Sequence, residues 1–448
     1  MNSRSREHVS ELRARSPTRG MDEFLLWASD AGIWRHEAFH VALTATEGYG
    51  ATASSALHSG EVIVRVPRAI VMSISTLDDS VRQATASANL SQTHALALEA
   101  CRTAALVASG VDQRAPWLAM WPAEPEGSWG LGDVSSLRPG DWSRELERLQ
   151  AEAEAGAREA HERLGAVLLD DPPPPSWDAY RWGMSIVTSR AADLVVSGER
   201  QPVLLPLIDV LNHRTTGHTC AIAYEPDDGN AAGDSFVLRC VRDVAPGETL
   251  TINYGHKENS ELMHGYGFAC CPNPHDAVLL RVPLSQGDSS PGCPPSMFEM
   301  QRAAMLPRGM VDEHSCLWVP LTWRDGTSQP RLSSQLRAML SLAAASSTPE
   351  LLSAMATMAA SAGDGEDQDD DVAHDRDGAS GMVLGQKAWA LLAQCCEADL
   401  AGLPTWNDVE TAPPLCAAAA VQARRALIQA ASDVAREGSA APHPTLSD

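Results

Sequence analysis

The stretch "LLPLIDVLNH", residues 204–213, is an apolar run that ends at three polar side chains, Asp209, Asn212 and His213. We expect a buried strand here. Because Asp and Asn are common turn formers, the simplest interpretation is that the strand ends in an ordinary turn with His213 next in line. The alternative is that a ligand binds where the apolar run ends. Taken alone, the stretch favours the two interpretations about equally.

The overall composition narrows the class of protein. The chain has 448 residues, 44% of them hydrophobic, which is typical of a soluble globular protein of two or three domains. No segment reaches the roughly 20 apolar residues of a membrane helix, so we expect no membrane partner. With 58 acidic and 34 basic residues, the net charge of −24 argues against nucleic acid and is compatible with a basic protein substrate.

Ten cysteines are present without a CxxC spacing, so we expect reduced thiols and no metal site. Residues 1–20 are rich in Ser and Arg but lack the apolar core of a secretory signal. We expect a disordered tail, with a weak transit segment as the alternative. The protein is accordingly expected to be a cytoplasmic or nuclear monomer, with a chloroplast or another organelle as the alternative location.

The residue composition and hydrophobic pattern change along the chain. Residues 21–75 combine a helix with strands such as "GEVIVRVP", and 76–185 are Ala-rich with the leucine spacing of helices. Strand patterns return in 186–285, where "APG" predicts a hairpin turn between "SFVLRCVRDV" and "ETLTINYG". Residues 286–448 are expected to be helical, and eight acidic residues in 363–378 predict a disordered loop.

Three further clusters contain residues that could carry chemistry. "EGYG" at 47–50 is either an ordinary turn or a place where the backbone approaches a ligand. Arg190, at the end of an apolar helix, could be a helix-end arginine or grip a carboxylate. Tyr254 and Tyr266 are each followed by glycine, and either residue could be a core tyrosine or contribute a hydroxyl to an active site. No single cluster decides between these interpretations.

The order of the clusters resembles the SET-domain methyltransferases, in the branch that includes Rubisco large-subunit lysine methyltransferase and actin-histidine methyltransferase. The matching segments, in chain order, are EGYG, "GEVIVRVP", Ser189-Arg190, "PLIDVLNH", "APGETLTINYG", and Asn259 through "ELMHGYGF" to Asn273 and Asp276. "PWLAMWPAEPEGSW" also resembles a stretch of that family. The resemblance implies an α+β fold: a β-rich SET domain with small sheets and a pseudoknot, split by a helical insertion and followed by an all-α lobe.

The same resemblance implies S-adenosyl-L-methionine as the cofactor and gives each cluster a role. Asn212 and His213 would hold the cofactor, Asp209 would support their turn, and Arg190 would pair with the methionine carboxylate. The turn of Glu47, Gly48, Tyr49 and Gly50 would close over the cofactor, and Tyr266 and Phe268 would pack against its adenine. Tyr254 matches the catalytic tyrosine, which would align a neutral amine for methyl transfer. The resemblance implies no metal.

The function implied is protein-lysine N-methylation of a non-histone protein that docks through the C-terminal helical lobe. Protein-histidine methylation on the same fold is an alternative, because imidazole is neutral near pH 7. A catalytically inactive protein-binding module is another alternative. Two departures from the family pattern concern the pocket. Thr52 stands where some relatives have a basic residue, so we expect that cofactor contact to be missing. Ala192 is smaller than the residue often found there, so we expect a roomier acceptor pocket.

Overall fold

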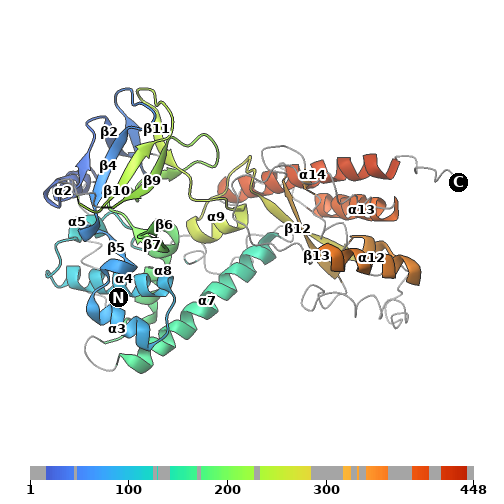
Figure 1. The fold of residues 1–448 in the computed structure, drawn as a ribbon, viewed down its shortest axis with the longest axis horizontal. Coiled ribbons are helices and arrows are strands. Elements are labelled where there is room, and N and C mark those ends of the chain that lie inside the picture. The colour runs from blue at the N-terminus through green and yellow to red at the C-terminus, as the bar shows by residue number, and fades with distance from the viewer. Residues whose placement is uncertain are drawn as a thin grey trace. The chain divides into compact units, whose positions relative to one another are not determined.

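The computed structural model describes residues 17–44, 48–124, 129, 142–168, 173–226, 233–283, 316–323, 330–331, 340–361, 386–402 and 415–440. The chain forms two compact units (Figure 1). The first comprises Met1–Val134, Leu146–Lys257 and Glu261–Phe268, and the second comprises Ser135–Glu145, Glu258–Ser260 and Ala269–Asp448. Among the described residues, no helix combines the length and apolarity that crossing a membrane requires.

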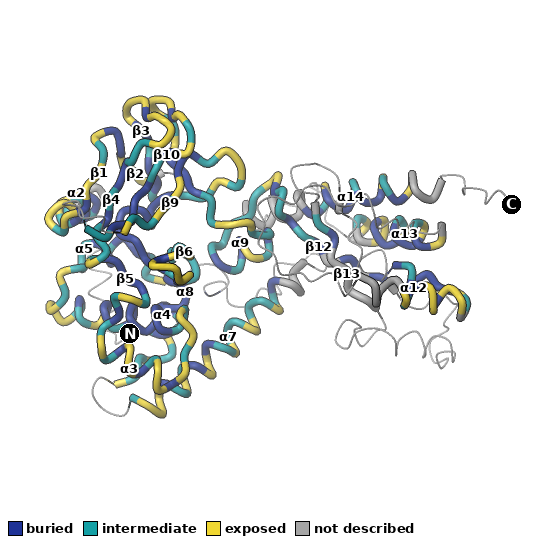
Figure 2. The backbone as a smooth tube through the Cα atoms, in the orientation of Figure 1, coloured by how far each residue is buried: buried dark blue, intermediate teal, exposed yellow. Residues whose placement is uncertain are grey.

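The first unit contains a four-stranded sheet of order β1-β4-β10-β9 whose neighbouring strands are all antiparallel. Its strands are β1 Trp34–Arg35, β4 Val62–Pro67, β10 Ser235–Cys240 and β9 Cys220–Glu225. Five of the six residues of β10 are buried, because this strand lies between β4 and β9 (Figure 2). The alternation of valines that predicted a strand in "GEVIVRVP" is realised in β4.

A second sheet of order β2-β3-β11-β8 joins segments that are distant in the sequence. Its strands are β2 Phe39–Thr44, β3 Gly48–Ala53, β11 Thr249–Ile252 and β8 Asn212–His213. The hairpin expected around "APG" is wrong, since β10 and β11 lie in different sheets and β11 pairs with β3 and β8 instead. A good turn sequence does not fix the partner of the strand that follows it, because tertiary packing decides the pairing.

The long buried strand expected over residues 204–213 is also wrong. A third sheet of order β5-β7-β6, from β5 Met72–Ser73, β7 Glu199–Leu204 and β6 Ala192–Val196, ends at Leu204. Turn structure follows over 206–210, with Leu207 at φ +71° and the Asp209 N–H donating to the Leu205 carbonyl at 3.0 Å. The run is apolar because it is buried, and a uniformly apolar run has no period that separates a strand from a buried turn.

The helices that lie entirely within the first unit are α2 Pro17–Asp30, α3 Asp79–Ser87, α4 Gln92–Ala108, α5 Ala115–Leu118 and α8 Trp177–Arg190. Helices α7 Trp142–Val167 and α9 Asn259–Tyr266 have most of their residues in this unit and begin in segments assigned to the second. Ser176 caps α8, as its sequence predicted, by accepting a hydrogen bond from the Ala179 N–H. Helix α2 begins at Pro17, so the last four residues of the expected N-terminal tail are helical; residues 1–16 lie outside the described residues.

The second unit is built from a three-stranded antiparallel sheet and three long helices. The strands are β12 Ala277–Pro283, β13 Cys316–Trp323 and β14 Pro330–Arg331, and the helices are α12 Thr348–Ser361, α13 Gln386–Gly402 and α14 Leu415–Ala440. The mixed fold expected from the sequence is confirmed. The C-terminal lobe nevertheless carries β13 and β14, because the β-branched and aromatic residues of "CLWVPLTW" favour a strand. The acidic loop 363–378 lies outside the described residues.

Helices α4 and α8 approach closely at Gly183. A Cβ atom there would lie 2.6 Å from the Ala97 carbonyl oxygen and 2.6 Å from the Cys101 sulfur. We therefore expect Gly183→Ala to lower the free energy of unfolding by about 1–3 kcal/mol, because overpacking outweighs the gain in helix propensity. Gly156→Ala, inside α7 with no atom within 4 Å of the added Cβ, should instead raise it by up to about 1 kcal/mol. Chemical denaturation measures both, and equal effects at the two positions would contradict the close approach.

Candidate active site

Tyr254 is attached to residues 211–213 at both of its ends. Strands β8 and β11 pair in parallel, with Thr251 opposite Asn212 and Ile252 opposite His213. Just beyond this pairing, the Tyr254 backbone N–H donates to Nδ1 of His213 at 3.0 Å, and the Tyr254 hydroxyl donates to the Leu211 carbonyl at 2.7 Å. The end of the "PLIDVLNH" stretch therefore fixes both the backbone and the hydroxyl of Tyr254.

His213 acts as a hydrogen-bond acceptor toward this tyrosine. Because Nδ1 accepts the Tyr254 N–H, the neutral ring carries its proton on Nε2, which lies 3.1 Å from the Thr215 hydroxyl. A doubly protonated imidazole has no acceptor, so protonation would remove the bond to Tyr254. His213 is thus a positioning residue for Tyr254.

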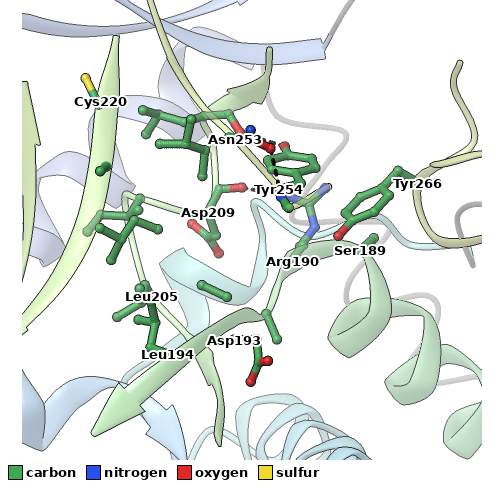
Figure 3. Close-up of a pocket in the computed structure, with 18 of the residues that line it drawn as sticks. Ser189, Arg190, Asp193, Leu194, Leu205, Asp209, Cys220, Asn253, Tyr254 and Tyr266 are labelled. Carbon is green, nitrogen blue, oxygen red and sulfur yellow. Dashed lines mark hydrogen bonds between the residues drawn. The ribbon is translucent and has the colours of Figure 1, made fainter. Parts of the chain in front are cut away.

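A cavity of about 540 Å³ lies beside Tyr254 (Figure 3). This volume falls within the roughly 300–1,000 Å³ of small-molecule sites. Its polar lining includes Arg190, Asp209, Asn253, Tyr254 and Tyr266. Apolar side chains that separate the cavity from the core include Leu194, Leu205 and Ile208. The cavity therefore combines a few convergent polar groups with an apolar wall, as small-molecule sites do.

Arg190 is the last residue of α8 and lines this cavity. Its Nη1 atom donates to the backbone carbonyl of Asp209 at 3.2 Å, which fixes the guanidinium beside the turn. A cation at a helix C-terminus is favoured by the helix dipole whatever its function. Here the same residue also places a guanidinium at the cavity wall, where a carboxylate could be bound bidentately.

Asp209 is held by two tryptophans that come from the helical insertion. Its Oδ2 atom accepts the indole N–H of Trp117 at 2.8 Å and that of Trp121 at 3.1 Å. Its Oδ1 atom is buried and has no hydrogen-bond partner among the described residues. Burial raises the pKa of Asp209 above 3.8, opposed by Arg190 and by the two indole donors. The sequence predicted a role for Asp209 but not these partners, whose only signal was the "PWLAMWPAEPEGSW" resemblance.

An aromatic cluster closes one side of the site. The ring centroids of Tyr254 and Tyr266 are 4.7 Å apart, those of Tyr266 and Phe268 are 5.9 Å apart, and those of His213 and Phe268 are 5.8 Å apart. Burial raises the pKa of Tyr266 to about 12, so its hydroxyl keeps its proton at neutral pH. The cluster offers flat apolar faces against which a planar ring could stack.

The turn expected at "EGYG" is wrong for its described residues, since Gly48, Tyr49 and Gly50 begin strand β3 and pair with β2. Strand β3 pairs with β11 through Ala51 opposite Leu250. The same antiparallel register, continued toward the site, brings Gly50 level with Thr251 and Tyr49 level with Ile252. Gly48 has a φ of +71°, a conformation that glycine adopts without strain. Glu47 lies outside the described residues.

The structure thus brings the predicted site residues together in two groups. Four of them line the cavity: Arg190, Asp209, Tyr254 and Tyr266. The others, apart from Glu47, lie in or beside the sheet and aromatic cluster that support Tyr254: Gly48, Tyr49, Gly50, Asn212, His213 and Phe268. Ala192 also lines the cavity. Sequence reasoning missed Asn253, His218 and Lys257 in the lining, because single polar residues beside a motif give no signal of their own.

Comparison with known proteins identifies the fold that carries this site. The SET-domain family model matches residues 48–255. The matched segment includes Arg190, Asp209 and Tyr254, three residues of the cavity lining. Among the described residues, no group of three or more His, Cys, Asp or Glu side chains is arranged to hold a metal ion.

The relatives include both lysine and histidine methyltransferases. The chain is 35% identical over 129 residues to ribosomal lysine N-methyltransferase set10 of Schizosaccharomyces pombe, covering 28% of this chain and 23% of that protein. It is 24% identical over 332 residues to actin-histidine N-methyltransferase of Danio rerio, covering 71% of this chain and 51% of that one. The chain thus spans between about a quarter and about half of the length of these two curated relatives.

Solved structures of similar fold belong to the Rubisco methyltransferase LSMT. Its SET domain bound to lysine and AdoHcy superposes with a TM-score of 0.63 at 16% identity, covering 94% of this chain and 92% of that chain. Rubisco LSMT bound to AdoMet superposes with a TM-score of 0.60 at 17% identity, covering 95% of this chain and 92% of that one. At this level of identity the likeness establishes the fold.

The buried carboxyl of Asp209 predicts a pH-dependent stability. A group whose folded pKa is raised contributes stability that is complete below its unfolded pKa and lost as the pH rises through its folded pKa. Asp209→Asn keeps one oxygen for both indole donors and cannot ionise. We therefore expect its unfolding free energy, relative to the wild type, to increase from about pH 4 to about pH 7.

Thermal or urea unfolding across this range measures the difference. Asp30→Asn, at an exposed position at the end of α2, serves as the control and should follow the wild type. A constant difference between Asp209→Asn and the wild type across the range would contradict the raised pKa.

Proposed function

We propose that this protein is an S-adenosyl-L-methionine-dependent protein-lysine N-methyltransferase that acts on a non-histone protein. The observation that carries the proposal is Tyr254, anchored at its backbone and its hydroxyl and facing a cavity lined by Arg190. The SET domain over residues 48–255 supplies the fold context for this chemistry.

The residues of the cavity fit the proposed cofactor. S-adenosylmethionine carries a carboxylate, an ammonium group and a flat purine, and supplies a methyl group on a positively charged sulfur. Arg190 would bind the carboxylate, since its guanidinium already lies at the cavity wall. The Oδ1 atom of Asp209, which has no hydrogen-bond partner in the described part of the chain, is a buried acceptor for a cationic or N–H group. The faces of Tyr266 and Phe268 would take the purine, with Asn212, His213 and the 47–50 segment around it.

Tyr254 would hold the acceptor nitrogen through its oxygen. Because its own hydrogen is donated to the Leu211 carbonyl, the hydroxyl oxygen would act as an acceptor toward an N–H of the incoming amine. The nitrogen must be uncharged to attack, whereas a lysine in water has a pKa of about 10.4. The apolar part of the lining, including Ile208 and Leu211, disfavours the charged form of a bound amine and so lowers its pKa.

Histidine is the second candidate for the acceptor, supported by the relatives that cover most of this chain. Actin-histidine N-methyltransferases match 71% of it at 24% identity, whereas ribosomal lysine N-methyltransferases match shorter segments at 34–35% identity. We favour lysine because the higher identity falls on the lysine enzymes. Ala192 in the cavity lining leaves room for either side chain.

The protein substrate is proposed to dock on the helices of the C-terminal lobe, with the enzyme acting as a monomer. The net charge of −24 supports a basic substrate surface. Incubating a cell lysate with the enzyme and labelled S-adenosylmethionine, followed by mass spectrometry of the labelled peptides, identifies the substrate and the acceptor atom together. Label on lysine supports the proposal, label on histidine supports the second candidate, and no label at all contradicts both.

Replacing Tyr254 should separate chemistry from cofactor binding. We expect Tyr254→Phe to lower the rate of methyl transfer by about 100-fold or more, because it removes the oxygen that aligns the acceptor. The cavity keeps Arg190 and Asp209, so binding of S-adenosylhomocysteine should remain. Methyl transfer to the substrate found in the lysate, together with calorimetry, measures both quantities.

Tyr224→Phe is the matched control, since this tyrosine, on β9, contacts Arg68 and does not line the cavity. It should methylate at the wild-type rate. A Tyr254→Phe variant with undiminished activity would remove Tyr254 from the reaction. Wild-type protein that binds a partner but neither the cofactor nor its analogue would indicate an inactive protein-binding module.

A further inference from the structure

Two buried cysteines face each other across adjacent strands. In the antiparallel pairing of β9 and β10, Cys220 lies directly opposite Cys240. Both are free thiols, exposed by only 0% and 1% respectively. Neither side chain has a role in the function proposed above. The pair therefore needs an explanation of its own.

The hydrogen-bond pattern places the two cysteines at a narrow position of the sheet. The Val241 N–H donates to the Thr219 carbonyl, so this neighbouring pair is hydrogen bonded across the two strands. The Cys240 N–H points the other way and donates to Glu61 beside β4. Because the two kinds of pair alternate along antiparallel strands, Cys220 and Cys240 form a non-hydrogen-bonded pair, whose side chains lie closer together.

The thiols also influence each other. Hydrogen bonding with Cys220 lowers the pKa of the Cys240 thiol, against the effect of burial, while Cys240 and burial together raise the pKa of Cys220. Arg242 lowers the pKa of both. Cys240 is therefore the more readily ionised member, and a thiolate is the form that reacts with an oxidant.

The pair adjoins the cavity of the proposed active site. Cys220 lines the 540 Å³ cavity beside Tyr254 (Figure 3). Among the described cysteines, Cys220 is the one in the lining of this cavity. The strand segment that carries the pair therefore forms part of the cavity wall, although both thiols are closed to solvent in this conformation.

We propose that Cys220 and Cys240 are an oxidisable dithiol that a hydroperoxide converts to a disulfide, and that this bond displaces the wall of the active-site cavity. The Cys240 thiolate attacks the peroxide O–O bond and becomes a sulfenic acid, while the leaving oxygen takes a proton. The Cys220 thiol then attacks that sulfur, an S–S bond forms, the S–O bond breaks and water leaves. The two thiols lose two electrons, which reduce the peroxide.

The consequence for the site follows from geometry. Cβ atoms of a directly opposite pair are about 4.5–5.5 Å apart, whereas a disulfide needs about 3.8 Å. Forming the bond thus pulls β9 toward β10 by up to about 1–2 Å at Cys220. Thr219, the next residue, accepts the Thr251 N–H on its hydroxyl at 2.8 Å and donates its own N–H to the Thr251 carbonyl at 3.1 Å. Movement of β9 is thereby transmitted to β11 and Tyr254.

Peptide mapping tests the bond. The full-length protein is treated with hydrogen peroxide, its remaining thiols are alkylated under denaturing conditions, and the digest is analysed by mass spectrometry without reduction. We expect one linked peptide pair joining Cys220 to Cys240, lost on treatment with dithiothreitol. Cys101, buried against the Ala179 carbonyl, serves as the internal control and should be alkylated before and after oxidation. Recovery of both Cys220 and Cys240 as alkylated thiols after peroxide would overturn the proposal.

Hydrogen–deuterium exchange tests the displacement without relying on methyl transfer. In the oxidised protein, the peptide containing Thr251 and Tyr254 should exchange at least severalfold faster than in the reduced protein. The Cys240→Ala variant, which cannot form the bond, should exchange equally with and without peroxide. Equal exchange in oxidised and reduced wild type would overturn the coupling to Tyr254. Both readouts are independent of whether the enzyme methylates lysine, so this proposal can fail while the proposed function stands.

Discussion

The site depends on one short parallel pairing, between the two residues of β8 and the end of β11. It brings Tyr254 beside Leu211 and His213, which lie 43 and 41 residues earlier in the chain. Two hydrogen bonds then fix the backbone and the hydroxyl of Tyr254. In the proposed reaction the hydroxyl oxygen would act as an acceptor toward the substrate nitrogen. Without the pairing of β8 with β11, the orientation of Tyr254 at the cavity would not be fixed.

Asp209 connects the segment that leads into β8 to the helical insertion. Its carboxylate accepts two indole N–H groups from Trp117 and Trp121, and its backbone carbonyl accepts from Arg190. A carboxylate buried in this way is costly when ionised, and the indole donors and the nearby guanidinium offset part of that cost. The helical insertion therefore contributes to the site, because its Trp117 and Trp121 hold Asp209 in the wall of the cavity.

Much of this site could be predicted from the sequence, because the order of the motifs is specific even where each motif alone is ambiguous. The motifs alone identified the site side chains that the structure brings together. Their roles in binding and catalysis stay predictions. These residues are Arg190, Asp209, His213, Tyr254, Tyr266 and Phe268. The backbone between them was harder. Residues 204–211 are apolar except for Asp209, and such a run gives no period to separate a strand from the buried turn that the structure contains.

Other errors share a physical cause, which is that strand pairing is decided by tertiary packing. The turn at "APG" joins strands of different sheets, and β13 lies within a segment expected to be helical. The partners of Asp209 were likewise hidden, because Trp117 and Trp121 are 92 and 88 residues away in the chain. The thiol pair of β9 and β10 became visible only once the register placed Cys220 opposite Cys240.

We propose that this cavity binds S-adenosylmethionine next to Tyr254. Isothermal titration calorimetry of the purified full-length protein with S-adenosylhomocysteine tests it most directly, with Arg190→Met as the comparison. We expect one-to-one binding of S-adenosylhomocysteine to the wild type and clearly weaker binding to Arg190→Met, because Arg190 would hold the carboxylate of the ligand. Absence of binding to correctly folded wild-type protein would contradict a cofactor site in this cavity.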